Sequence, residues 1–389
     1  MENAIKFLRI QNFKSIKDVT LHPRRVNLII GEPNVGKSNL LEAMSLLGSI
    51  TYEQTDKFMG SFIRYEEPRQ LFYDILVANT IKVETDKGLA ILLFEKEARL
   101  FQYLFCDTAF YEEVAGAVVS KPRNSLVGKG EHYVMRNVLS GNFNKRTFDG
   151  IMPEHFINTQ FGDSANFSIN GEPFASIVEH ELKLPPLAYN FQKNKVSEDH
   201  GSKLLTPPNG SNLIEVIQTH SKLRKEITGM FARYNQKLQL RMDERRIEII
   251  KDQDGIIYSY PYSSVADTLQ RIIFYLAAIE SNDDAVLLFE EPEAHSFPVY
   301  VSKLGRRIVE STNNQFFIDT HSPYLIDGIL EDMLTDDAQA GELAIFAAYY
   351  EDHQTKVHQL SDEEIRSIRN DSIDVFYNMK RFTTGTADA

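Results

Sequence analysis

Several features that mark other protein classes are missing from this 389-residue chain. Its only cysteine is Cys106, which excludes an intrachain disulfide and a cysteine zinc site. It has no run of about 18 apolar residues, so no segment is expected to span a membrane. The N-terminus has neither the basic start nor the long apolar stretch of a signal peptide. Together these absences predict a cytoplasmic protein with no membrane partner.

Positive charge is also scarce, since 42 Lys and Arg residues stand against 55 Asp and Glu residues, for a net charge of −13. This balance argues against a broad, non-specific nucleic-acid surface. Two small basic clusters could still form a local patch, although a solvated surface is the simpler interpretation of both. They are Lys193, Lys195 and Lys203, and Arg241, Arg245 and Arg246. Binding to nucleic acid stays open but is not indicated by charge.

The most informative segment is residues 31–38, which read Gly-Glu-Pro-Asn-Val-Gly-Lys-Ser. It matches the phosphate-binding loop G-x-x-x-x-G-K-[ST] at every fixed position. The apolar run 25–30 before it predicts a buried strand, and the apolar residues after it recur at helical spacing, at Leu40, Met44 and Leu47. A surface turn that matches by chance is the alternative, and the flanking strand and helix argue against it.

A strand, glycine loop and helix N-terminus form an anion site, because backbone N–H groups and the helix dipole both favour a phosphate. Lys37 is expected to reach the β- and γ-phosphates of a nucleotide, and Ser38 to bind Mg²⁺ through its hydroxyl. The residues expected to bind the nucleotide in this loop are Gly31, Asn34, Val35, Gly36, Lys37, Ser38 and Asn39.

A second apolar run, 285–290, ends in adjacent acids, Glu290 and Glu291. Open α/β sheets place their ligands at the carboxyl ends of strands, where this run delivers both carboxylates. Successive side chains of a strand point to opposite sides, so one acid can serve the metal and the other a water molecule. We assign Glu290 to Mg²⁺ and Glu291 to the water. The alternative is an acidic strand end that caps a helix.

A third apolar run, 315–319, is followed by Thr320, His321, Ser322 and Pro323. The interval from the acidic strand fits one crossover helix, so the two strand ends are expected to be neighbours. His321 would then hydrogen-bond the γ-phosphate. A histidine satisfied within the core is the alternative.

The remaining pattern predicts an α/β fold in three parts, 1–105, 106–205 and 206–389. Hairpins are expected at Asp86–Gly88 and at Asp254–Gly255. Strands and helices alternate in the last part, which predicts parallel strands joined by crossover helices. The elements expected there are a long helix from Asn212 through Phe231, helices at 264–281 and 297–311, a strand pair near 343–359, and a last helix with a capping box formed by Ser361 and Glu364.

Four motifs occur in the order found in one family: Phe13–Ile16, the loop 31–38, Glu290–His295 and Thr320–Pro323. They resemble the ABC-type ATPases of the RecF, SMC and OLD group, often described as AAA family ATP-binding proteins. The resemblance covers about 1–105 and 205–370. It implies a P-loop NTPase head with a mixed sheet, an antiparallel β subdomain and an inserted α/β region, which binds ATP and Mg²⁺.

The resemblance also implies a head-to-tail homodimer, or a higher homo-oligomer, with composite ATP sites. A signature loop of one subunit then contacts the ATP of the other, and here it would lie at residues 262–271, with Ser263 and Ser264 as the contacts. The glycine pair usual in that loop is absent. The glutamine that usually links the metal to the inserted region is not assignable, and Gln54 and Gln70 are the candidates. No Toprim nuclease and no long coiled coil are expected.

Two functions fit these observations. The first is an ATP-hydrolysing, nucleotide-dependent dimerisation switch that acts on a partner effector, such as a nuclease or toxin, as the resemblance to anti-phage ATPases implies. The second is a RecF-like DNA-repair ATPase that binds DNA directly, which the acidic balance disfavours. A protein that binds ATP without turnover is a third interpretation, and the intact Lys37, Ser38, Glu290, Glu291 and His321 argue against it.

Overall fold

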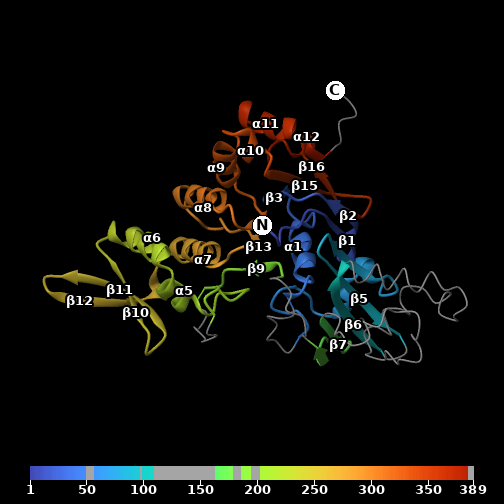
Figure 1. Cartoon of the computed structure of the whole chain (residues 1–389), viewed down its shortest axis with the longest axis horizontal. Coiled ribbons are helices and arrows are strands. Elements are labelled where there is room, and N and C mark those ends of the chain that lie inside the picture. Colours follow the sequence, from blue (N-terminus) through green and yellow to red (C-terminus); the bar gives the residue numbers. More distant parts are fainter. Residues whose placement is uncertain (50–56, 97–98, 109–162, 178–184, 194–201, 384–389) are drawn as a thin grey trace, which may run out of the picture.

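A computed structural model describes residues 1–49, 57–96, 99–108, 163–177, 185–193 and 202–383. These residues form three sheets, of six, seven and three strands. In Figure 1 the six-stranded sheet lies at the centre, with α7, α8 and α9 on one side and α1 with the seven-stranded sheet on the other. The three-stranded sheet projects away from this body. The predicted α/β class is confirmed, with a mixed central sheet and an antiparallel β subdomain.

The central sheet is mostly parallel, with β3 between β14 and β15 and with β13 beyond β14. Only β16, at one edge, runs antiparallel to its neighbour. In spatial order its strands are β16 (Gln354–Gln359), β15 (Leu343–Glu351), β3 (Val26–Gly31), β14 (Gln315–Asp319), β13 (Val286–Glu290) and β9 (Leu187–Tyr189).

Both faces of this sheet are buried, which is why its strands are continuous apolar runs. Leu28 and Ile30 pack with the helices α7, α8 and α9, whereas Ile29 between them packs with α1 and the seven-stranded sheet. The helices on the first face are α7 (Asp267–Ser281), α8 (Pro298–Glu310) and α9 (Pro323–Met333), and α1 (Lys37–Ser45) lies on the second. The strand β3, which leads into the phosphate loop, is thereby fixed between two hydrophobic cores.

The seven-stranded sheet is antiparallel throughout and packs on α1. Its order is β2 (Ile16–Leu21), β1 (Leu8–Phe13), β4 (Ile81–Thr85), β5 (Gly88–Glu95), β6 (Leu100–Asp107), β7 (Asp163–Phe167) and β8 (Pro173–Ile177). The predicted hairpin at Asp86–Gly88 joins β4 to β5. Two short 3₁₀ helices, η2 (Pro68–Leu71) and η3 (Tyr73–Ile75), precede β4.

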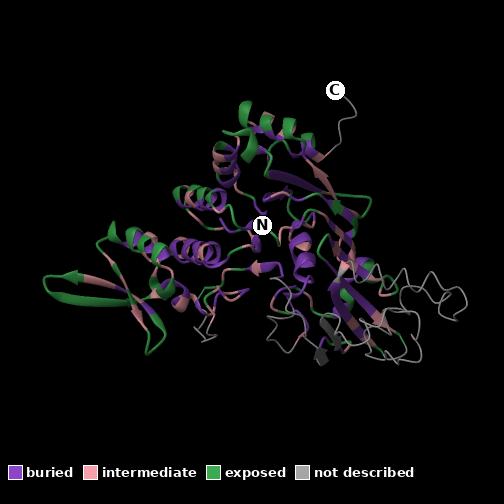
Figure 2. Ribbon diagram, viewed as in Figure 1, coloured by how far each residue is buried: buried purple, intermediate pink, exposed green. Residues whose placement is uncertain are grey.

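The three-stranded sheet contains β10 (Lys237–Arg241), β11 (Arg246–Gln253) and β12 (Ile256–Pro261), and the predicted hairpin at Asp254–Gly255 joins the last two. Every residue of β12 is exposed, as the colouring in Figure 2 shows. The other described helices are α5 (Leu213–Thr219), α6 (Ser221–Ala232), η5 (Tyr262–Ser264), α10 (Asp337–Ala340), α11 (Asp362–Asn370) and α12 (Met379–Thr383).

Two predicted elements need correction. The long helix expected from Asn212 through Phe231 is two helices, because His220 takes an extended conformation between α5 and α6. The helix expected to start at Ser264 starts at Asp267 instead, because Val265 and Ala266 are extended.

The capping box at Ser361 and Glu364 is confirmed, although α12 follows that helix. The boundaries at 105 and 205 stay a prediction, since 109–162, 178–184 and 194–201 lie outside the described residues. No helix in the described part of the chain is long and apolar enough to cross a membrane.

Candidate functional site

The phosphate loop joins the end of β3 to the start of α1, and two glycines are required by its geometry. A Cβ on Gly31 would lie 2.5 Å from the Ala348 carbonyl oxygen on β15. Gly36 has a left-handed φ of 96° and would press a Cβ against the Thr355 and Ser15 hydroxyls. A residue with a side chain would not fit at either position without moving its neighbours. Glycine fits because it has no Cβ to meet these atoms and adopts a positive φ without strain.

The loop is held from outside by hydrogen bonds to its own backbone and to α1. The Thr355 hydroxyl donates to the Val35 carbonyl at 2.8 Å and lies 2.6 Å from the Ser15 hydroxyl. The Asn39 amide donates to Ser15 Oγ at 2.7 Å. Ser15 belongs to the Phe13–Ile16 motif, so that motif supports the phosphate loop. Asn39, predicted to bind nucleotide, is part of this support, and its nucleotide contact stays a prediction.

Lys37 is the first residue of α1 and is only 5% exposed. Its Nζ donates to the carbonyls of Gly31 at 3.2 Å and Glu32 at 3.0 Å, so the ammonium lies across the mouth of its own loop. Burial lowers the pKa of Lys37, while Asp319 and Glu291 act in the opposite direction. The two carbonyls are neutral dipoles. A phosphate bound at the loop would supply the negative charge that the Lys37 ammonium lacks there.

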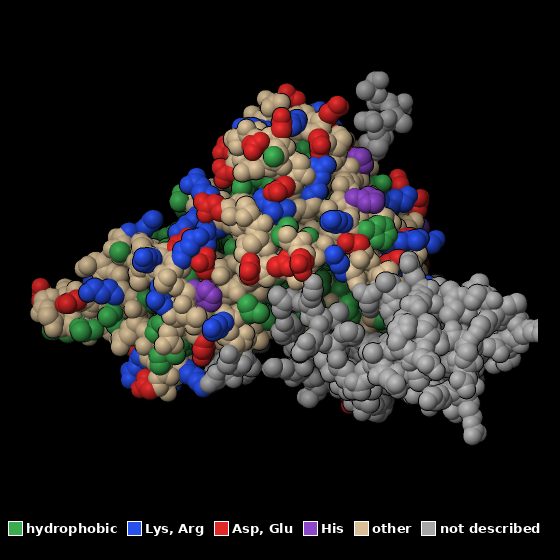
Figure 3. Space-filling view, viewed as in Figure 1, with side chains coloured by type: hydrophobic (Ala, Val, Ile, Leu, Met, Phe, Trp, Pro, Cys, Tyr) green, Lys and Arg blue, Asp and Glu red, His purple; other side chains and the backbone are tan. Residues whose placement is uncertain are grey.

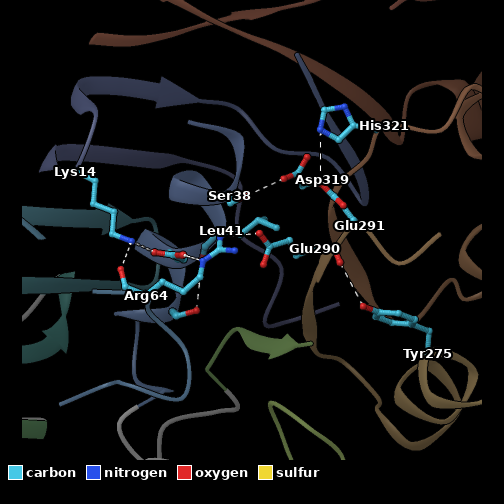
Figure 4. Close-up of polar contacts among 11 residues, drawn as sticks. Lys14, Ser38, Leu41, Arg64, Tyr275, Glu290, Glu291, Asp319 and His321 are labelled. Atoms are coloured by element: carbon cyan, nitrogen blue, oxygen red, sulfur yellow. Dashed lines mark hydrogen bonds and ion pairs between the residues drawn. The ribbon is translucent and has the colours of Figure 1, made fainter. Parts of the chain in front are cut away.

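Ser38 follows Lys37 and donates its hydroxyl to Asp319 Oδ2 at 3.1 Å (Figure 4). Asp319 ends β14 and is 1% exposed, and burial raises its pKa to about 7 although Lys37 opposes the rise. Its second oxygen, Oδ1, is buried and has no hydrogen-bond partner among the described residues. The sequence predicted Glu290 as the acid that binds the metal together with Ser38, and it gave Asp319 no role.

Glu290 occupies the neighbouring position, since it pairs with Asp319 in the parallel register of β13 and β14. Its carboxylate accepts a hydrogen bond from Arg64 at 2.7 Å. Arg64 also pairs with Glu42 of α1, which in turn pairs with Lys14. Figure 4 shows these groups as one chain of charges that reaches from β13 to the β1–β2 turn. Glu290, predicted as a metal ligand, is therefore engaged by a cation of its own chain.

Glu291 and His321 come together as predicted, with Glu291 Oε1 and His321 Nε2 3.6 Å apart. Glu291 has a left-handed φ of 41°, and its N–H donates to the Asp319 carbonyl at 2.9 Å. Such backbone strain in a non-glycine residue is common at functional sites. Burial and Lys37 lower the pKa of His321, which keeps its imidazole neutral at neutral pH.

A buried carboxylate that was not predicted as part of the site, Glu293, sets the position of this histidine. Its Oε1 accepts hydrogen bonds from the Thr320 hydroxyl at 2.5 Å and from the His321 N–H at 2.9 Å. Burial raises the pKa of Glu293, and these two hydrogen bonds oppose the rise. Glu293, which follows the acidic strand β13, therefore fixes the position of Thr320 and His321.

The signature-like loop, residues 262–271, lies on the connection from β12 to α7. Ser263 and Ser264 are exposed, and Ser264 donates its hydroxyl to the Pro261 carbonyl at 2.7 Å. The residue before α7 is Ala266, which offers no side-chain cap. Ser264 therefore does not cap this helix, and among the described residues no hydrogen bond or ion pair joins either serine to the phosphate loop.

Of the basic residues considered for nucleic acid, Lys195 lies outside the described residues, and two of the arginines are paired with an acid. Arg241 and Arg246 both pair with Glu244. On the face shown in Figure 3, Lys and Arg side chains alternate with Asp and Glu side chains. Of the two candidate glutamines, Gln54 lies outside the described residues, and Gln70 accepts hydrogen bonds from the Glu66 and Glu67 N–H groups beside η2.

Two family models match the chain over these elements. The model described as "AAA ATPase domain" matches residues 4–111, which include the phosphate loop. The model described as "AAA domain, putative AbiEii toxin, Type IV TA system" matches residues 186–327, which include the acidic strand end and His321. Each model matches less than half of the chain, and together they support an ABC-type AAA ATPase. The first match contains the phosphate loop, and the second contains the ends of β13 and β14.

Solved SMC heads are similar to this ABC-type ATPase. One head, bound to the C-winged-helix domain of ScpA, is 14% identical with a TM-score of 0.44, over 94% of this chain and 99% of that chain. The head domain from Thermotoga maritima is 11% identical with a TM-score of 0.37, over 92% and 99%.

A third head carries an extended coiled coil and is bound to the C-terminal domain of ScpA derived from Pyrococcus furiosus. It is 14% identical with a TM-score of 0.42, over 95% of this chain and 99% of that chain. A search of curated proteins found no match.

Proposed function

We propose that this chain binds and hydrolyses ATP at the edge of the central sheet and uses the cycle as a dimerisation switch. The observation that carries the proposal is the meeting of three strand ends. The phosphate loop after β3, Asp319 at the end of β14, and the Glu291–His321 pair all lie at the same edge. A loop for phosphates, acids for a metal and a carboxylate for water are the parts that phosphoryl transfer needs.

Each residue has a role that its surroundings support. Lys37 exchanges its carbonyl partners for the β- and γ-phosphates, and the N–H groups of the loop from Asn34 to Ser38 hold the same oxygens. Glu291 orients the attacking water and accepts its proton. His321, neutral and held by its backbone bond to Glu293, donates a hydrogen bond to the γ-phosphate.

The donor set also fits Mg²⁺. The Ser38 hydroxyl donates a hydrogen bond to Asp319 Oδ2, which leaves the lone pairs of the Ser38 oxygen free for a cation. Asp319 Oδ1 is a buried acceptor without a partner in the described structure. Among the described residues, no group of three or more His, Cys, Asp or Glu is placed to hold a metal. Mg²⁺ is usually bound by one or two protein groups, phosphates and water, which agrees with a sparse protein site. Bound there, it neutralises the charge on the phosphates.

The partners follow from the family. In the proposed dimer, Ser263 and Ser264 of one subunit face the ATP held by the other, so ATP closes two heads and hydrolysis opens them. The motion is passed to an effector protein, and the family description that names a type IV toxin–antitoxin system supports a role in defence. The SMC heads in two of the solved structures carry a bound ScpA domain, so heads of this fold do present a surface to a partner.

The test is Glu291→Gln, with the exposed Glu363→Gln as its matched control. Losing the group that positions water should slow hydrolysis by about 100-fold while ATP binding is kept. The ATP-bound variant should then accumulate as a dimer in light scattering. Wild-type turnover in Glu291→Gln would refute the role of Glu291. A monomer at saturating ATP would refute the switch.

A further inference from the structure

We propose that Asp319 is the carboxylate that positions Mg²⁺ through Ser38, whereas the sequence alone assigned the metal to Glu290 of β13. The inference rests on the proposed ATP site and adds a residue from a different strand. Asp319 ends β14, which lies between β3 with the phosphate loop and β13 with Glu290. Of these strand ends, it is the one whose carboxylate contacts the Ser38 hydroxyl.

The geometry gives Asp319 a clear action on Ser38. The hydroxyl has one proton, and the 3.1 Å bond to Asp319 Oδ2 commits that proton to the carboxylate. The lone pairs of the Ser38 oxygen are then directed away from Asp319 and are available to a cation. Without Asp319, the hydroxyl would be free to rotate and to present its proton to the metal instead. Asp319 is therefore a positioning residue for the first protein ligand of Mg²⁺.

The second oxygen of Asp319 points to the same conclusion. Oδ1 is buried with no partner among the described residues, and an unsatisfied buried acceptor costs about 1–3 kcal/mol. The cation that acts on the charge of Asp319 is Lys37, whose Nζ donates to two loop carbonyls and would be drawn to the phosphates when ATP is bound. A divalent cation, or a water molecule that it holds, would satisfy Oδ1 and supply the missing positive charge.

Glu290 is less well placed for the same task. Its carboxylate is in an ion pair with Arg64, at 2.7 Å, and that arginine is shared with the buried Glu42. To reach a cation beside Ser38, Glu290 would have to give up this pair. Asp319 already contacts Ser38 and needs no rearrangement. The two acids are adjacent in register, so Glu290 can still join the site once Arg64 is released.

The experiment measures Mg²⁺ dependence separately from turnover. A fluorescent ATP analogue that resists hydrolysis is titrated first in EDTA and then with increasing Mg²⁺. In Asp319→Asn, affinity in EDTA should stay the same or increase, because a negative charge beside the phosphates is lost. The Mg²⁺ concentration at half-effect should rise by about 10- to 100-fold, the usual cost of removing a group that orients a metal ligand. Asp243→Asn, an exposed change of the same kind, should match wild type.

Further measurements keep the inference falsifiable. Thermal unfolding shows whether Asp319→Asn is folded, and Mn²⁺ electron paramagnetic resonance counts the bound metal directly. If Asp319 acts through Ser38, Ser38→Ala should cost less Mg²⁺ affinity in the Asp319→Asn background than in wild type. An unchanged Mg²⁺ midpoint in a folded Asp319→Asn overturns the inference. If wild type itself does not bind the analogue, the proposed ATP site fails instead.

Discussion

The two halves of the proposed composite site are built very differently. On the phosphate-loop side, Lys37 and Asp319 are almost fully buried, with Lys37 Nζ bonded to two loop carbonyls and Asp319 Oδ2 bonded to Ser38. On the signature-like side, Ser263 and Ser264 are exposed, and the hydroxyl of Ser264 turns back to Pro261. Adjacent β12 also exposes Ile256 and Ile257, at 57% and 65% (Figure 2).

The contrast shows where order comes from in each half. Burial of β3 between two hydrophobic cores and of α1 in one of them anchors both ends of the phosphate loop before any ligand arrives, and such preorganisation is what electrostatic catalysis requires. In the signature-like loop, Tyr262 and Val265 pack against the core, but Ser263 and Ser264 stay exposed and would meet ATP only in the proposed dimer. A subunit alone would then bind ATP with a complete loop but hydrolyse it slowly.

The largest effect is expected from Lys37→Ala, which breaks the ordered half. The variant loses the buried ammonium that crosses the loop, so ATP affinity should fall by about 100-fold or more, the scale of a lost charge-assisted contact in a dry site. Isothermal titration with ATP measures it, and Lys225→Ala on the exposed face of α6 is the control. Binding at the wild-type level would show that the loop does not hold the phosphates through Lys37.

A mixture of subunits tests whether the exposed half acts in trans. Lys37→Ala and Ser264→Arg should each be inactive alone, since one lacks the loop cation and the other blocks the signature-like face. In a mixed dimer one composite site carries both lesions and the other carries none, so ATPase activity should return toward about half of wild type per mixed dimer. If mixed dimers demonstrably form without activity, the serines work within their own subunit or not at all.

The smallest effect is a pH dependence of stability that belongs to the ordered half. The pKa of Asp319 is raised to about 7 by burial from an ordinary 3.8, so the folded protein holds this proton more tightly than the unfolded chain does. The free energy of unfolding should therefore fall as pH rises from about 4 to about 7, the range in which the folded protein binds this proton and the unfolded chain does not.

Asp319→Asn removes the charge and should flatten that part of the profile. In urea titrations of nucleotide-free protein with EDTA, the variant should be more stable than wild type at pH 8 and equal to it near pH 4. Parallel profiles for the two proteins would mean that Asp319 stays ionised in the fold.

The ordered half was also the more predictable one. The phosphate loop and the meeting of Glu291 with His321 follow from short-range pattern, because parallel strands bring their carboxyl ends to one edge. The Ser38–Asp319 contact could not be predicted in this way. It depends on β14 lying between β3 and β13, and no short-range sequence pattern specifies the order of strands in a sheet. The charge chain through Arg64 was missed for the same reason.

The exposed half shows the limit of local signals. Ser264 and Asp267 have the spacing of a helix cap, but the Pro261 carbonyl takes the Ser264 hydroxyl, and the helix begins only at Asp267. The break between α5 and α6 at His220 was not predicted, because no glycine or proline lies there. Strand β10, which pairs with β11, was not predicted.

The strand order of the central sheet affects how this protein folds during its synthesis on the ribosome. Both neighbours of β3 in the central sheet, β14 and β15, come from the far end of the chain, and Ser38 meets Asp319 across 281 positions. Contacts this distant in sequence form late and slow folding. A nascent chain therefore carries the whole phosphate loop long before it has a sheet in which to hold it. ATP binding is then a property of finished molecules only.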